Sequence, residues 1–253
     1  MEALPFEILF EDKDLIIVNK PNGWFVHSSA FDRRAEQILM PVLRDFLGSF
    51  VYPAHRIDRK TSGIVIFSKN QETHIRMRSI FEQQDVTKIY LAIVRGYITF
   101  PLSINYTLTN DNGKIQEALT EVFPIDHAEI SLPFGKHNTS RYSLVAAKPI
   151  TGRQHQIRKH LKHIFHPILG DRPHGCNKQN RFMLEQFGLT EMLLHAHKIS
   201  FTHPHTLKTT EITCLPPTKF IQMANNLQLR LDKIDQVEFQ QNIDPKYLQN
   251  DHG

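Results

Sequence analysis

The chain has 253 residues, of which 40% are hydrophobic and 22% are charged, proportions typical of a soluble globular protein with one substantial core or two modest ones. Its formal net charge is +4, which fits an anionic partner if the charge is clustered. Two cysteines argue against a disulfide scaffold, and with no signal peptide or bilayer-length apolar run we expect a cytoplasmic protein without membrane association.

The N-terminal part predicts a β-hairpin, a turn and a helix. Glu7–Glu11 and Leu15–Asn19 are strand-like and flank Asp12–Asp14, a pattern typical of a hairpin. A proline and a glycine two residues apart then predict a turn within Lys20–His27. Apolar residues at helical spacing predict a helix over residues 34–50.

A highly charged loop precedes a buried strand. The run Ile64–Phe67 is β-branched and aromatic, so it predicts a core strand, and Ala54–Gly63 is the loop that leads into it. Within the loop, Asp58 lies between Arg56 and Arg59. The simplest interpretation of such a triplet is a surface salt bridge, which contributes little to stability. Because so much charge is costly to hold before a core strand, the loop is also a candidate site.

The middle of the chain predicts one helix followed by a long strand. Asn70 can cap a helix that runs to about Gln84. The segment Val86–Gly96 is apolar on both faces, which predicts a central strand. Thr109–Gly113 is rich in turn residues, whereas residues 114–140 mix short strand signals with loops.

Basic residues cluster in the second half of the chain. After a predicted strand at Tyr142–Ala147, residues 154–165 have apolar positions at helical spacing. Six lysines and arginines, and no acidic residue, lie from Arg141 to Gly170. The helix predicted over 154–165 therefore has a basic character that the net charge only suggests.

The last predicted elements are a strand at 192–201 and a helix at 218–231. Residues 232–253 lean acidic and show little periodicity, which predicts a loosely held tail. No repeat or linker indicates a second domain, so we expect one catalytic domain over residues 1–231.

Four segments, in the order in which they occur, resemble the motifs of the RluA-type pseudouridine synthases. His55–Gly63 reads His-Arg-Ile-Asp-Arg-Lys-Thr-Ser-Gly and is similar to the family's active-site motif. Lys88–Tyr90 resembles its Lys-x-Tyr motif, and Thr151–His160 resembles its Thr-Gly-Arg-x-His-Gln-Ile-Arg-x-His motif. Leu194–Ala196 resembles the last motif. Four motifs in the family's order make a chance match a poor explanation.

The resemblance implies a mixed α+β fold, with a long, bent, mostly antiparallel sheet, flanking helices and a central basic cleft. It also implies the isomerisation of a uridine in RNA to pseudouridine. That reaction breaks a C–N glycosidic bond and forms a C–C bond, and no group or electron enters or leaves. We therefore expect no metal, no nucleotide cofactor and no obligatory protein partner.

The resemblance assigns Asp58 the role of the catalytic carboxylate, which attacks either the sugar or the base. Arg153 is the expected counter-ion, because a guanidinium is always charged and binds a carboxylate through two hydrogen bonds. Tyr90 is expected to lie against the base and to move a proton during ring re-closure. Ile157 is expected to form an apolar wall of the site.

Further residues are expected to contact the RNA. The resemblance assigns Arg56 to the space vacated by a flipped uridine, and the helix residues Arg158, Lys159 and Lys162 to phosphates. Within the family, the chain most resembles members that modify the uridine at position 65 of tRNA. The segments that carry this similarity are Gly23–His27, Asp32–Arg33, Gly170–Gly175, Gln179–Arg181, Phe187–Leu189 and Thr202–Pro204.

Other interpretations stay open. The same enzyme could act on ribosomal RNA, or the fold could serve a non-catalytic RNA-binding or assembly factor. Taken singly, Arg153 could cap carbonyl groups, Tyr90 could be a core tyrosine, and basic helix faces are usually only solvated. A protein kinase is excluded because Ile57 interrupts the His-Arg-Asp order. A zinc hydrolase is a distant alternative, because no acidic ligands converge with histidines at metal spacing in the sequence.

Overall fold

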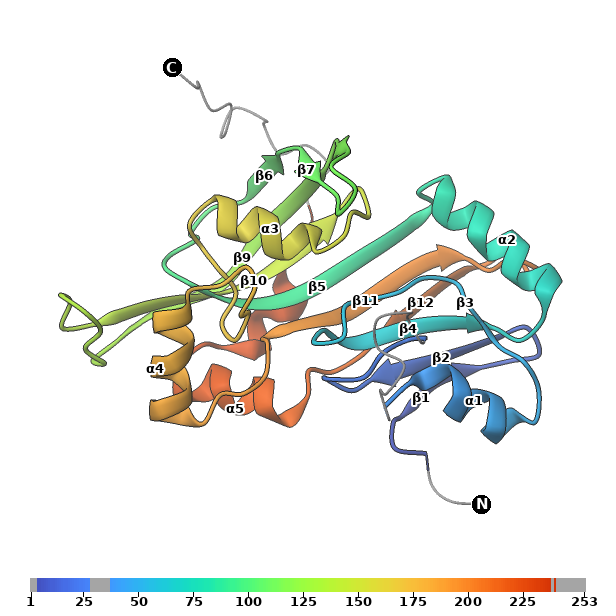
Figure 1. Cartoon of the computed structure of the whole chain (residues 1–253), viewed down its shortest axis with the longest axis horizontal. Helices are drawn as coiled ribbons and strands as arrows, with labels where there is room; N and C mark the ends of the chain where they lie inside the picture. Colours follow the sequence, from blue (N-terminus) through green and yellow to red (C-terminus); the bar gives the residue numbers. More distant parts are fainter. Residues whose placement is uncertain (1–3, 28–36, 238, 240–253) are drawn as a thin grey trace. The chain divides into compact units, whose positions relative to one another are not determined.

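A computed structural model of the protein describes residues 4–27, 37–237 and 239 (Figure 1). The start of the helix predicted over 34–50 lies outside these ranges, as do Asp32 and Arg33, which carried part of the family resemblance.

Contacts between Cα atoms divide the chain into two compact units, each built from two stretches of sequence. Unit 1 is Met1–Lys88 with His195–Pro217, and unit 2 is Ile89–Leu194 with Thr218–Gly253. A compact unit need not fold alone, so the single catalytic domain expected over residues 1–231 stays a prediction.

The described residues of unit 1 form a mixed sheet and two helices. Its strands follow the order β1-β2-β4-β11, with β3 beside β4 and β12 beside β11. The elements are β1 (Ile8–Glu11), β2 (Leu15–Lys20), α1 (Leu39–Leu47), β3 (Tyr52–Pro53), β4 (Ser62–Ser68), α2 (Gln71–Glu82), β11 (Leu194–Thr202) and β12 (Thr209–Thr213). β4 and β11 pair in parallel, whereas the pairs β1–β2, β2–β4, β3–β4 and β11–β12 are antiparallel. The predicted hairpin of β1 and β2 is confirmed.

Alternate residues of the strands form the core of unit 1 against α2. Leu15 and Ile17 of β2 and Ile64 and Ile66 of β4 are buried together with Met77 of α2. The predicted cap of this helix is also confirmed, because the side chain of its N-cap residue accepts the backbone N–H three positions later at 2.8 Å.

Unit 2 contains an antiparallel sheet in the order β5-β10-β9-β6. These strands are β5 (Val86–Arg95), β6 (Leu102–Asn105), β9 (Leu119–Ile130) and β10 (Ser140–Pro149), and a small ribbon of β7 (Leu108–Thr109) and β8 (Ile115–Gln116) encloses the predicted turn. The segment 114–140, which the sequence left unassigned, therefore contains one long strand, the 12-residue β9.

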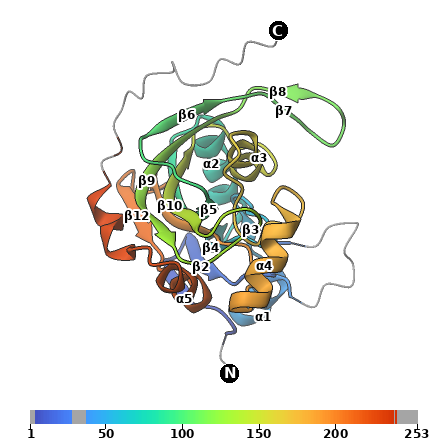
Figure 2. The same ribbon diagram turned by 90° about the vertical axis from the view of Figure 1, so that its left-hand side faces the viewer.

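Helices cover both faces of the unit 2 sheet (Figures 1 and 2). Helix α3 (Gln156–His163) packs Leu161 against one set of strand residues, which includes Val122 and Val145. The alternate set packs with α4 (Asn177–Phe187) and α5 (Thr218–Asn226) in a second cluster. This two-residue alternation is the reason why one sheet supports two separate cores.

Two features of unit 2 differ from the sequence prediction. Helix α4 was not predicted. A 3₁₀ helix (Leu231–Gln236) and Phe239 pack on the core, and Lys233 forms an ion pair with Asp126. The predicted loose tail is therefore wrong for these residues.

The mostly antiparallel α+β architecture with flanking helices agrees with the predicted fold class, whereas the basic cleft stays a prediction. Among the described residues, no helix is both long and apolar enough to cross a bilayer. Cys176 and Cys214 are both free thiols.

Candidate active site

The loop that carries Asp58 is fixed by backbone contacts to the turn after β2. Asp58 is half-buried, and its carbonyl oxygen accepts the N–H of Thr61 at 3.0 Å. The N–H of Gly23 donates to the Arg59 carbonyl at 2.9 Å, and Arg59 Nε donates back to the Gly23 carbonyl at 2.9 Å. The Arg59 guanidinium also lies 4.7 Å from the centre of the Phe25 ring. Two segments far apart in sequence therefore hold this loop together.

Lys20 is the residue that joins these two segments. Its side chain is fully buried, and Nζ donates hydrogen bonds to three backbone carbonyls. The acceptors are Pro21 at 3.0 Å, Trp24 at 2.8 Å and Arg59 at 2.8 Å. All three donors of an ammonium group thus have partners, as a buried charge requires.

The buried ammonium lies close enough to Asp58 for their charges to interact. Burial lowers the pKa of Lys20 to about 7, the negative charge of Asp58 opposes this shift, and the positive charge of Arg59 adds to it. Lys20 was not among the predicted site residues, although its position two residues after Val18 placed it on a buried strand face. The structure therefore adds a cation beside the candidate catalytic carboxylate.

One side of the loop is anchored in the core, and the other is open to solvent. His55 Nε2 accepts the N–H of Ile66 at 3.2 Å, and its ring stacks on Phe81 with centroids 5.0 Å apart. Burial, together with the charge of Lys88, lowers the pKa of His55 to about 3, so the ring is neutral. Arg56 is exposed next to it, and its role in RNA binding stays a prediction.

In unit 2, Arg153 lies in a turn that the side chain of Gln156 organises. Gln156 is buried, and its amide makes four hydrogen bonds. The partners are Thr151 Oγ1 (2.7 Å), the Arg153 N–H (3.0 Å), the Leu119 carbonyl (2.9 Å) and Thr120 Oγ1 (2.9 Å). Arg153 Nε donates to the Glu117 carbonyl at 2.9 Å. Its two terminal nitrogens make no hydrogen bond to the described residues, so they are available to an anion.

Tyr90 and Ile157 belong to the same apolar cluster of unit 2. Tyr90 is half-buried in β5 opposite Ala147 of β10, and Ile157 is buried on α3. Both pack with Val122 and Leu161 in the core between α3 and the sheet. The structure thus brings these two predicted site residues together, while their roles toward a base stay predictions.

The basic face of α3 differs in part from the prediction. Arg158 is buried, and its Nε and Nη2 bind the two carboxylate oxygens of Asp171, each at 2.8 Å. The expectation that Arg158 contacts phosphate is therefore wrong, because its guanidinium neutralises a buried carboxylate. Lys159 is half-buried and donates to the Thr109 carbonyl at 3.2 Å, whereas Lys162 is exposed.

Two buried histidines form hydrogen bonds within the core. His160 Nδ1 is 2.9 Å from Thr120 Oγ1, and His195 Nδ1 is 2.9 Å from Ser62 Oγ. His195 Nε2 is 3.0 Å from the Cys214 carbonyl, to which it donates. Burial lowers the pKa of both His160 and His195 to about 4, so both rings are neutral at pH 7.

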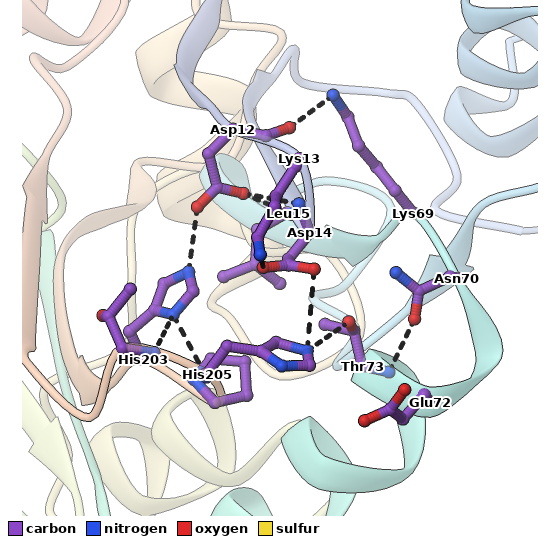
Figure 3. Close-up of polar contacts among 12 residues, drawn as sticks. Asp12, Lys13, Asp14, Leu15, Lys69, Asn70, Glu72, Thr73, His203 and His205 are labelled. Carbon is purple, nitrogen blue, oxygen red and sulfur yellow. Dashed lines mark hydrogen bonds and ion pairs between the residues drawn. The ribbon is translucent and has the colours of Figure 1, made fainter.

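One group of residues does meet the spacing of a metal site, which corrects the expectation that no acidic ligands converge with histidines. Asp12, Asp14 and His203 offer ligand atoms within 4.8 Å of one another (Figure 3). His203 Nδ1, however, accepts the N–H groups of His205 at 3.3 Å and Thr206 at 3.2 Å. Nε2 must then carry the proton, which it donates to Asp12 at 2.9 Å. Neither ring nitrogen therefore has a lone pair available to a cation.

The same hydrogen bonds explain the charge of this group. Burial raises the pKa of Asp12, but two backbone N–H donors and His203 outweigh it and hold that pKa below its ordinary value. The group joins the β1–β2 turn to the β11–β12 turn. That the protein needs no metal stays a prediction.

The sequence is similar to that of known proteins. Residues 14–163 match the family model described as RNA pseudouridylate synthase. The tRNA pseudouridine synthase C of Haemophilus ducreyi is 42% identical over 232 residues, which are 88% of this chain and 96% of that protein. The protein of the same name from Pasteurella multocida is 40% identical over 242 residues, or 91% of this chain and 100% of that protein.

Solved structures agree on the fold. Human RNA Pseudouridylate Synthase Domain Containing 1 superposes with a TM-score of 0.67 at 23% identity, covering 86% of this chain and 87% of that chain. For Domain Containing 4 the TM-score is 0.64 at 24% identity, with coverages of 88% and 94%. At these identities the likeness shows the fold alone.

We predict that Lys20 makes stability depend on pH. Its pKa of about 7 lies below the ordinary 10.5, so between these values the unfolded chain carries a proton that the folded chain lacks. The free energy of unfolding should therefore rise with pH in this window, by at most about 1.4 kcal/mol per pH unit. Below this window Lys20 is protonated in both states and adds no pH dependence.

The measurement is urea denaturation of the wild type and Lys20→Met from about pH 6 to about pH 9. The free energy of unfolding of the wild type, relative to that of Lys20→Met, should rise above pH 7. Lys219→Met, which removes an exposed lysine, serves as the control and should keep the wild-type dependence. A constant difference between wild type and Lys20→Met across the range would contradict the prediction.

Proposed function

The chain belongs to the RNA pseudouridylate synthase family, and from this premise we propose that it converts a uridine of tRNA, the one at position 65, into pseudouridine in the cytoplasm. The relatives named tRNA pseudouridine synthase C support tRNA as the substrate. The observation that carries the proposed chemistry is the half-buried Asp58, which lies in a loop held by hydrogen bonds, close to the buried ammonium of Lys20.

Asp58 acts as the carboxylate that attacks the sugar or the base while the C–N bond is exchanged for a C–C bond. Arg153 supplies positive charge through its terminal nitrogens, and its backbone is held by the amide of Gln156. Tyr90 presents its ring to the base and moves a proton, and Ile157 provides apolar surface. The reaction is an isomerisation, so this scheme requires no metal, nucleotide cofactor or protein partner.

The target uridine must leave its stack before Asp58 can reach it, at a cost of a few kcal/mol. Exposed Arg56 next to the loop is proposed to fill the vacated space. Lys162, which is exposed, and Lys159 contribute contacts to phosphates. These contacts are independent of sequence, so the choice of uridine must come from RNA shape and from groups around the loop.

Mapping of pseudouridine in total RNA with and without this gene tests the substrate. We expect one tRNA position, 65, to lose its pseudouridine when the gene is deleted. Loss in ribosomal RNA with an intact tRNA site would favour the same reaction on a different RNA. No change in any RNA would favour a non-catalytic RNA-binding or assembly factor.

We predict that Asp58→Asn removes catalysis and spares RNA binding. The substitution keeps the shape of the side chain and removes its charge, so the single-turnover rate on a tRNA transcript should fall on the order of 10³-fold or more. Asp85→Asn, which neutralises an exposed carboxylate of the same unit, should leave the rate unchanged. Undiminished modification by Asp58→Asn would show that this carboxylate is not catalytic.

We also predict a phosphate contact at Lys162. Lys162→Ala should weaken tRNA binding and lower the slope of log affinity against log salt by about one, because one fewer counterion is released. The matched control is Lys219→Ala, an exposed lysine on α5, which covers the opposite face of the same sheet. Equal slopes for the wild type and Lys162→Ala would place this lysine off the RNA.

A further inference from the structure

Phe165, just beyond the end of α3, is the most exposed large hydrophobic side chain among the described residues. It is 88% exposed. Among the residues that the structure describes, its ring contacts no other aromatic ring. Isolated exposed apolar residues are common on protein surfaces, so exposure alone would carry little weight.

The backbone at Phe165 adds a second observation. Its φ is 64°, in the left-handed region that disfavours residues with a β-carbon. The Phe165 N–H donates to the Lys162 carbonyl at 3.0 Å, and the next N–H donates to the Leu161 carbonyl at 2.9 Å. These two bonds form a Schellman helix end, in which glycine is the favoured residue at this position. Phe165 therefore occupies a position at which glycine would have less backbone strain.

The surroundings of Phe165 are cationic and aromatic. Lys162 is exposed on the last turn of α3, and the chain has no acidic residue from Arg141 to Gly170. One turn of α3 also carries His163, whose ring stacks on Tyr106 with centroids 3.7 Å apart and planes inclined by 19°. An exposed ring beside positive charge is an arrangement that proteins use to stack an unpaired nucleobase.

We propose that Phe165 is a stacking site for an unpaired base of the RNA substrate, with Lys162 binding the adjacent phosphate. The site deepens the proposed function and rests on it, because the substrate is taken to be RNA. A ring stacks on any of the four bases, so this contact supplies affinity without reading sequence. It acts in binding, and the rate of the bound complex does not depend on it.

The chain offers a matched control at Leu207. This residue has a φ of 57° and is 76% exposed, so it shares the backbone and the exposure of Phe165. Leu207 lies in the turn between β11 and β12, and its side chain has no π face. Leu207→Gly therefore relieves the same backbone conformation without removing a ring.

The test compares Phe165→Gly with Leu207→Gly for melting temperature and for binding and turnover of a tRNA transcript. Both variants should melt no lower than the wild type. Phe165→Gly alone should bind the transcript about tenfold more weakly, the loss expected for one base–aromatic stack. Its single-turnover rate at saturating enzyme should stay at the wild-type value, since the bound complex is intact.

Two bulky variants separate stacking from apolar contact and keep the test valid if Phe165→Gly folds poorly. Phe165→Trp should bind as tightly as the wild type or more tightly, and Phe165→Leu should behave like the glycine variant. Wild-type affinity of Phe165→Leu, or unchanged affinity of Phe165→Gly, would overturn the stacking site. The proposed function would still stand if the wild-type protein modified tRNA. A wild-type protein that modifies no tRNA would instead refute the proposed function.

Discussion

The structure around the candidate catalytic loop depends on the burial of one ammonium group. A charged lysine is costly to remove from water. It is tolerated at position 20 because three carbonyl oxygens accept hydrogen bonds from its ammonium group and Asp58 lies nearby. One of these carbonyls comes from a residue 39 positions later in the chain. The same bonds that satisfy the buried charge therefore fix the path of the charged loop, so its geometry follows from an electrostatic requirement.

Unit 2 solves a comparable problem with a neutral group. The turn that carries Arg153 precedes α3 and could not be held by helical hydrogen bonds, because the first N–H groups of a helix have no partners within it. The buried amide of Gln156 supplies the missing hydrogen bonds. Its oxygen accepts the N–H of Arg153 in the turn, and its nitrogen donates to the first residue of β9. Since β9 also packs against α3, the arginine is positioned by the sheet as well as by the helix that follows its turn.

Local signals account for what could be predicted. The hairpin, the capped helix α2, the strands β4 and β5 and the helix α3 each follow from short-range patterns, as does the candidate Asp58. Helix α4 was missed because it buries only Gln179 and Met183, which leaves almost no apolar stripe. Arg158 was misjudged because its partner lies in a loop beyond the helix, and helical spacing cannot reveal such a contact.

The interrupted chain path of unit 1 has a consequence for biosynthesis. Strand β4, which follows the catalytic loop, pairs with β11, and the bond between Ser62 and His195 spans 133 residues. The ribosome must therefore synthesise residues 89–194, the first stretch of unit 2, before this partner strand emerges, and during that time one edge of β4 has no β11 to pair with. The sheet of unit 1, and with it the strand that follows the catalytic loop, can therefore be completed only after β11 has left the ribosome.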